Sequence, residues 1–461
     1  MKRLLPLILA LFAVPALASE ITLPEYERVE LENGAVLLLA EKHDVPLIGL
    51  RARLRGGSVA DPHGKQGLAS LFATLIQKGA GDRDAATFAE AAAAVGGQLS
   101  ASAGLESISI SAEFLSRDAE LMLELVGDML LHPTLDEAEF DKARSRSIDL
   151  IAAAKDSNPS NLMSSYANAF LFGAHPYGNP GTGSETTLAG IDHEDLAQYF
   201  EQHVGGDRLV IAVAGDFDAA AMKARLSALF GDWRPAAAPL PEPGEPARTT
   251  GGRVLLVDKP GATQTYFWIG NIGVAIDYPR RAELRIANTL FGGRITSMLM
   301  TALRVESGLT YGARSSVEQH SLPGSATIRS YTQTDKTVEA IDLAIEMLDR
   351  LHKRGVDDEM IVSARNYIMG QFPPTLETAS DLASMFAFLE LNGLDRDYID
   401  SYGGALEAAT PVTVHNTISD VYPGIDDLAI VLIGDAGAIR EAVSKYGPVT
   451  EMSIAEPRFH P

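Results

Sequence analysis

The chain repeats the order of its parts, and this duplication constrains the fold more than any other feature. The last segments of the two halves of the chain, 207–231 and 426–447, both have the pattern of a strand, a Gly-Asp turn and a helix. The stretches 35–57 and 253–273 correspond as well, each with two strands joined by a short polar turn. Because the order agrees over roughly 200 residues rather than over one motif, we predict two homologous domains.

A segment without apolar periodicity separates the two copies. PAAAPLPEPGEPARTTGG, residues 235–252, is rich in Pro, Ala and Gly and is typical of a linker. We therefore expect an N-terminal domain over 19–234 and a C-terminal domain over 253–461. The length of 461 residues suits two domains better than one.

The order of elements inside each copy indicates the fold class. A helical block follows the first two strands, and strand-like sequence returns at 107–115 and 325–333. Long amphipathic segments at 119–132 and 336–355 come next. This order predicts an α+β fold in which each domain has an antiparallel sheet with helices packed on one face.

The first residues are typical of an export signal. Residues 1–18 carry a positive start at Lys2 and Arg3, an apolar run to Val14, and a small-x-small sequence before Ser19. We expect cleavage there, and no later apolar run is long enough to span a bilayer. The sequence thus predicts a soluble, exported chain without membrane insertion, located in the periplasm if the cell is Gram-negative.

Composition removes several classes of function. The formal charge of −23 argues against a nucleic-acid partner, because phosphate binding needs a basic surface. The absence of cysteine excludes disulfides, thiolate metal sites and cysteine nucleophiles. There is no serine elbow, no phosphate-binding glycine motif, and no pair of histidines four residues apart.

The stretch GLASLFATLIQKG, residues 67–79, predicts a helix that Gly79 would end. Ser70, Ala73 and Thr74 are spaced i, i+3 and i+4 and share one helix face. Such a face can hold two metal ligands and a general base. Here it holds two hydroxyls and a methyl group.

This helix and its surroundings resemble the pitrilysin/insulinase-type zinc metallopeptidases, which include mitochondrial processing peptidase and its bacterial relatives. In that family the helix carries H-x-x-E-H, with two zinc ligands and the Glu base. The resemblance places Ser70, Ala73 and Thr74 at those positions, and the family's third ligand, a Glu, at Leu150 with Asp149 as the neighbouring possibility. Hydroxyls are poor zinc ligands and Ala73 cannot act as a base. We therefore expect no metal and no cofactor in this chain, and no peptide hydrolysis by it alone.

The segments 175–200 and 290–315 resemble the same family. Its active site lies between two halves that close like a clamshell, and one half supplies an Arg and a Tyr seven residues apart. Arg304 and Tyr311 have that spacing, which implies a carbonyl-binding guanidinium and a phenol that donates to the oxyanion.

The glycines of FGG, Gly292 and Gly293, have two readings. They allow either the close approach of a substrate backbone or a simple turn.

The resemblance implies the zinc-less subunit of an exported heterodimeric metallopeptidase. A homologous partner would carry H-x-x-E-H and the zinc, and extended peptides would be the substrates. Two alternatives remain: a peptide-binding or assembly protein without a catalytic role, and an enzyme with a relocated site. The retained pair Arg304 and Tyr311 favours the zinc-less peptidase subunit over both alternatives, because a scaffold protein need not keep this pair.

Overall fold

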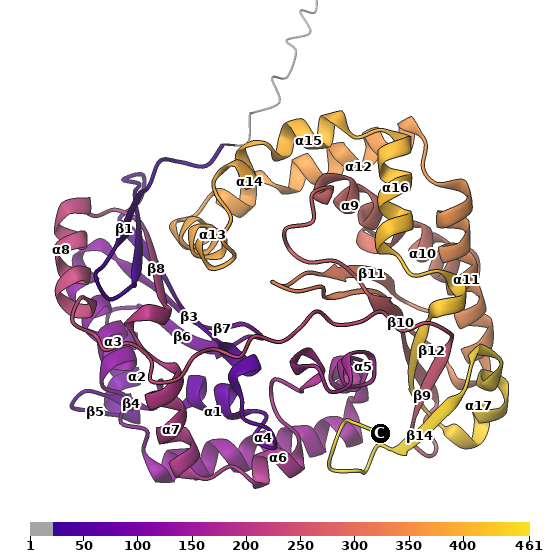
Figure 1. The fold of residues 1–461 in the computed structure, drawn as a ribbon, viewed down its shortest axis with the longest axis horizontal. Coiled ribbons are helices and arrows are strands. Elements are labelled where there is room, and N and C mark those ends of the chain that lie inside the picture. The colour runs from indigo at the N-terminus through magenta and orange to yellow at the C-terminus, as the bar shows by residue number, and fades with distance from the viewer. Residues whose placement is uncertain (1–21) are drawn as a thin grey trace, which may run out of the picture.

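The computed structural model describes residues 22–461, and the chain forms two similar halves set side by side (Figure 1). The first half ends with helix α8 (Ala219–Phe230), and the second begins with strand β9 (Arg253–Asp258). The segment between them contains no helix or strand, and it runs along the middle of the molecule in Figure 1. The predicted signal peptide, residues 1–18, lies outside the described residues.

Each half is built around a six-stranded sheet. The strand orders are β1-β2-β8-β3-β7-β6 and β11-β12-β10-β13-β9-β14. The first sheet comprises β1 (Glu27–Glu30), β2 (Val36–Glu41), β3 (Leu47–Arg55), β6 (Gln98–Ala103), β7 (Ser107–Leu115) and β8 (Leu209–Gly215). The second comprises β9 (Arg253–Asp258), β10 (Gln264–Ile272), β11 (Ala313–Glu318), β12 (Ser325–Gln333), β13 (Ala429–Gly434) and β14 (Val449–Ser453).

The two sheets confirm the predicted duplication and the α+β class. The order β2-β8-β3-β7-β6 in the first sheet corresponds to the order β9-β13-β10-β12-β11 in the second. One detail of the expected sheets is wrong, because they are mixed rather than antiparallel. Strand β8 pairs parallel to β2, with Leu38 opposite Ala212, and β13 pairs parallel to β9. The chain passes through the helices of its half before returning to the neighbouring strand, and such a crossover gives parallel pairing.

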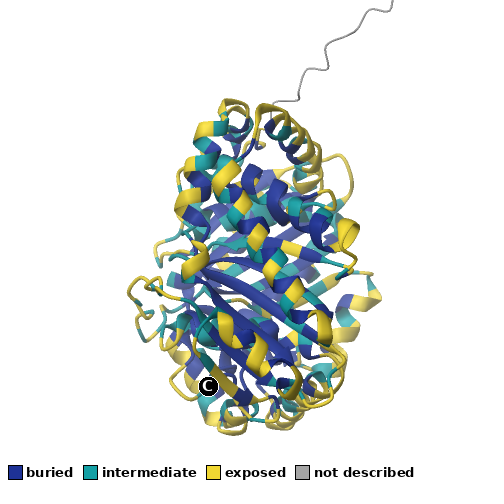
Figure 2. Cartoon of the chain, turned by 90° about the vertical axis from the view of Figure 1, so that its right-hand side faces the viewer, coloured by how far each residue is buried: buried dark blue, intermediate teal, exposed yellow. Residues whose placement is uncertain are grey.

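Helices cover the outer face of each sheet, and Figure 2 shows the buried strands of the second half behind helices with exposed outer faces. Side chains alternate along a strand, so Leu37 and Leu39 of β2 join the core shared with these helices. In the first half the larger helices are α1 (Leu68–Leu75), α2 (Ala85–Ala94), α3 (Ala119–Leu131), α4 (Glu137–Ser157), α7 (His193–His203) and α8. In the second they are α9 (Arg281–Asn288), α11 (Thr337–Arg354), α12 (Asp358–Gln371), α16 (Pro411–Val421) and α17 (Ala436–Val443).

The opposite face of each sheet is covered by a helix from the other half, which the sequence prediction of helices on one face missed. Helix α13 (Ala379–Leu391), from the second half, lies on β3 and β8 of the first. Helix α5 (Met163–Phe172), from the first half, lies on β10 and β13 of the second. The strands are apolar on both faces, so each sheet needs a second cover.

The exchange buries apolar side chains between the halves. Leu38 of β2 packs with Phe386 of α13, and both are almost fully buried. Trp268 of β10 belongs to the same buried cluster as Tyr166 of α5. The halves are therefore joined by two hydrophobic layers in addition to the linker.

Within residues 22–461, none of the helices combines the length and apolar character that a membrane crossing requires.

Candidate functional site

Helix α1 begins at a buried carboxylate. The carboxylate of Asp61 accepts hydrogen bonds from the backbone N–H groups of Gly67 and Ala69, both at 2.8 Å. Gly67 has a φ of 102°, a conformation that glycine adopts at little cost. Burial raises the pKa of Asp61 to about 7, and the backbone donors oppose that shift. The entry into the helix is thus fixed by a group that is costly to bury when it is charged.

The helix is shorter than the sequence indicates. It ends at Leu75, and Gly79 instead belongs to the short strand β4 (Gly79–Ala80) with a φ of 120°. Gln77 lies between them and donates from Nε2 to the carbonyl oxygens of Ala73, at 2.8 Å, and Ala101, at 2.9 Å. This amide ties the end of α1 to the edge strand β6.

Ser70, Ala73 and Thr74, the positions that the resemblance implies for the zinc ligands and the base, lie on α1. Thr74 Oγ1 donates to the carbonyl oxygen of Ser70 at 2.9 Å, so its hydroxyl is already engaged. Ala73 is 1 % exposed and contributes only a methyl group. The face therefore offers two neutral hydroxyls, one of which is held by the helix backbone.

The position implied for the third ligand lies on α4, which packs against α1. Leu150 is 60 % exposed, and Asp149 beside it is exposed as well. Zinc is held by thiolate, imidazole or carboxylate groups, and none of the positions on α1 provides one. Across residues 22–461 no group of three His, Cys, Asp or Glu side chains could hold a metal ion. The donor set at these positions does not fit zinc.

The segment with Arg304 and Tyr311 lies in the opposite half from α1 (Figure 1). Arg304 lies in a widened helical turn (Thr301–Glu306), and Tyr311 lies in the loop before β11. The Tyr311 side chain is 80 % exposed and Arg304 is also exposed. Among the described residues, neither the guanidinium nor the phenol has a hydrogen-bond or ion-pair partner.

The backbone between these two side chains is firmly held. The N–H of Leu309 donates to the carbonyl oxygen of Leu303 at 2.9 Å, and Thr332 Oγ1 donates to Leu309 O at 2.7 Å. Gly308 closes the turn with a φ of 66°. The backbone of this segment is thus fixed, whereas the two polar side-chain ends reach solvent.

Two exposed apolar side chains in the same segment were not identified from the sequence. Ile295 is 71 % exposed and Val305 is 73 % exposed. No periodic pattern in the sequence distinguishes them from buried neighbours such as Leu303. Arg304 and Tyr311 thus share their segment with exposed apolar surface.

Gly292 has a packing role. A Cβ at Gly292 would lie 2.2 Å from the backbone nitrogen of Ser315, so only glycine permits this approach of the helical turn to β11. Gly293 is exposed, and a Cβ there would lie 3.0 Å from the carbonyl oxygen of Asn288. A backbone therefore does approach Gly292 closely, but it is the backbone of β11 rather than that of a substrate. Substrate contact at either glycine stays a prediction.

The fold is shared with solved bacterial structures. A peptidase M16 inactive domain from Pseudomonas fluorescens superimposes with a TM-score of 0.82, at 21 % identity, over 89 % of this chain and 98 % of that one. A protease from Helicobacter pylori gives the same TM-score at 18 % identity, over 89 % of this chain and all of that one.

Sequence relatives extend the comparison. An uncharacterized zinc protease of Bacillus subtilis is 24 % identical over 413 residues, covering 89 % of this chain and 98 % of that protein. One from Mycobacterium leprae is 26 % identical over 349 residues, covering 75 % of this chain and 76 % of that protein. Residues 39–184 match the model of the insulinase family, peptidase family M16, and residues 190–368 match that of the peptidase M16 inactive domain. The chain belongs to the insulinase family of peptidases, family M16.

Proposed function

We propose that this chain is the zinc-less subunit of an exported two-subunit peptidase, completed by a homologous partner that carries H-x-x-E-H. The observation that carries the proposal is the contrast between the two halves. The α1 positions Ser70, Ala73 and Thr74 offer no metal donor, whereas Arg304 and Tyr311 project free polar ends from fixed backbone. A chain that lacks one part of a site and keeps the other is suited to completing a site elsewhere.

The residues of this chain have distinct tasks in that proposal. The phenol of Tyr311 donates a hydrogen bond to the oxyanion that forms when the peptide carbonyl is attacked. The Arg304 guanidinium presents a fixed fork of donors to a substrate backbone carbonyl. Both groups are exposed and therefore accessible to a peptide held by the partner. The zinc chemistry belongs to the partner subunit.

The substrates in this proposal are extended peptides. Strand β6 is an edge of its sheet, and its outward backbone groups are available for pairing with an added strand, apart from the Ala101 carbonyl held by Gln77. The apolar residues Ile295 and Val305 offer contacts for peptide side chains near Arg304. The periplasm is the proposed location, on the strength of the N-terminal signal.

The test mixes the mature chain with a similar exported protein that has an intact H-x-x-E-H motif, such as one encoded by a neighbouring gene. Bound zinc and hydrolysis of unstructured peptides are measured for each chain and for the mixture. We expect the chain alone to be inert and the mixture to cleave faster than the partner alone. If the mixture gains nothing, an assembly or peptide-binding role replaces the proposal. If the chain alone binds stoichiometric zinc and cleaves, the ligand assignment is wrong.

A further inference from the structure

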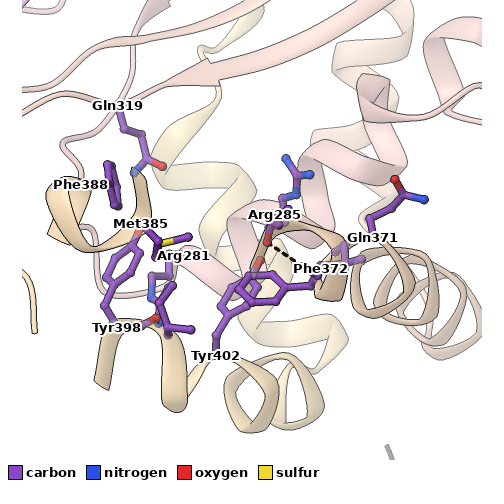
Figure 3. A pocket seen from close by; sticks show the side chains of 12 residues that line it. Arg281, Arg285, Gln319, Gln371, Phe372, Met385, Phe388, Tyr398 and Tyr402 are labelled. Carbon is purple, nitrogen blue, oxygen red and sulfur yellow. Dashed lines mark hydrogen bonds between the residues drawn. The ribbon is translucent and has the colours of Figure 1, made fainter. Parts of the chain in front are cut away.

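A cavity of about 360 Å³ lies where α9 meets α13 and the short helices α14 (Asp397–Asp400) and α15 (Tyr402–Ala408). None of the side chains proposed for the peptidase site lines it. Aromatic rings form part of its wall: the rings of Phe372 and Tyr402 are 5.5 Å apart, and the ring of Tyr398 is nearby (Figure 3). Two arginines, Arg281 and Arg285, supply its charge.

Arg281 is held in place by aromatic rings. Its guanidinium carbon lies 3.7 Å from the ring centroid of Tyr398 and 4.9 Å from that of Tyr402. One of its N–H groups donates to the carbonyl oxygen of Tyr398. Stacked in this way, the planar guanidinium has lost most of its rotational freedom before any ligand arrives.

Arg285 is one helical turn further along α9 and therefore on the same face as Arg281. It is exposed, and within residues 22–461 neither arginine forms an ion pair. No Asp or Glu lines the cavity. Burial raises the pKa of Tyr402 to about 12, and both guanidiniums act in the opposite direction. In a chain with a formal charge of −23, this is a concentration of uncompensated positive charge.

From the two arginines and the aromatic walls we infer a binding site for a carboxylate attached to an aromatic or aliphatic group. The guanidiniums present paired N–H donors that match a carboxylate, and the rings of Phe372, Tyr398 and Tyr402 cover an apolar body. The volume suits a single side chain or a small organic acid rather than a folded partner. A peptide C-terminus with an apolar last residue and a free organic acid share this chemistry.

The test uses the mature chain by itself and does not depend on the peptidase proposal. Binding of phenylbutyrate and of the tripeptide Ala-Ala-Phe is measured by calorimetry at low ionic strength. Each acid is paired with a neutral counterpart, phenylbutanol for the first and the C-terminal amide for the second. Acetate, which lacks the apolar body, completes the series. We expect each acid that binds to have a higher affinity than its neutral counterpart and than acetate. The affinity of these acids should fall as salt is added.

The variant Arg285→Gln removes one charge from an exposed position without disturbing the stacked Arg281. We expect it to weaken acid binding by about tenfold or more, the usual effect of losing a charged hydrogen bond. Arg117→Gln, at an exposed arginine of the first half, is the matched control and leaves binding unchanged. Preference for the tripeptide acid identifies a peptide C-terminus as the ligand, and preference for phenylbutyrate identifies a free acid. The inference is overturned if neither acid exceeds its neutral counterpart, or if Arg285→Gln changes neither affinity.

Discussion

Gly49 on strand β3 of the first half touches the backbone at Ser380 on helix α13 of the second. A Cβ at Gly49 would lie 2.5 Å from the backbone nitrogen of Ser380, closer than real Cβ contacts allow. Ser380 in turn donates from Oγ to the carboxylate of Glu113 on the neighbouring strand β7, at 2.5 Å. The exchanged helix thus rests on the sheet at backbone distance, and the two halves cannot separate without opening this contact.

Replacing Gly49 by alanine tests how much the helix exchange contributes to stability. The added methyl group meets backbone atoms, which cannot rotate away, so α13 must shift. We expect a loss of about 1–3 kcal/mol in the free energy of unfolding, the usual cost of overpacking. The control is Gly404→Ala on α15, where a Cβ meets nothing within 4 Å. That change should stabilise the chain by about 0.5–1 kcal/mol. Equal melting temperatures for both variants would contradict the close contact.

The exchange also marks the limit of what the sequence predicts about the fold. The duplication was readable because each copy has the same succession of strands and helices. The apolar composition of α13 is consistent with a buried helix, but it does not show which sheet the helix packs on. The parallel pairing of β8 with β2 was missed for a similar reason, since strand sequences do not name their neighbours.

The candidate site, too, could be predicted from the sequence only in part. The positions Arg304 and Tyr311 came from spacing and resemblance, and the structure adds that their ends are free and their backbone fixed. Exposure of Ile295 could not be predicted, because an isoleucine in a non-periodic segment is usually buried. Gly292 suited either of two readings, and only the distance to Ser315 identifies its packing partner.

The buried carboxylate of Asp61 predicts a pH dependence of stability. Its pKa is about 7 in the folded chain against an ordinary value of 3.8, so the folded state holds the proton more tightly. The stabilisation is full below the ordinary pKa, declines as the pH rises, and is lost above about pH 7. The free energy of unfolding, measured by chemical denaturation, should therefore decline between pH 4 and pH 8. In the variant Asp61→Asn this decline should be smaller. The exposed Asp232→Asn is the control. A decline of equal slope in both variants would remove Asp61 as its source.

Placing ligands on α1 and α4 tests whether these helices have the geometry of the family's metal site. The variant Ser70→His, Thr74→His, Leu150→Glu places two imidazoles one helical turn apart and a carboxylate on the adjacent helix. If these helices keep the geometry of the family, it should bind about one zinc ion per chain, because three such ligands suffice for an open zinc site. Elemental analysis after dialysis measures the metal.

The matching control for that variant omits Thr74→His and leaves one imidazole and the carboxylate. It should retain far less zinc after the same dialysis. A folded triple variant that binds no more zinc than this control would show that α1 and α4 no longer hold ligand positions within reach of one ion.

The phenol of Tyr311 is the most direct probe of the proposed function. Because its hydroxyl has no partner among the described residues, Tyr311→Phe should leave the melting temperature unchanged. In the mixture with the zinc-binding partner, the same change should lower turnover by ~10²–10³, the usual loss for one oxyanion donor. Tyr367→Phe, at another exposed tyrosine of the second half, is the control and should leave turnover intact. Because the lost bond forms only in the transition state, the effect should fall on kcat rather than on KM. Equal turnover for both variants would exclude the Tyr311 phenol from catalysis.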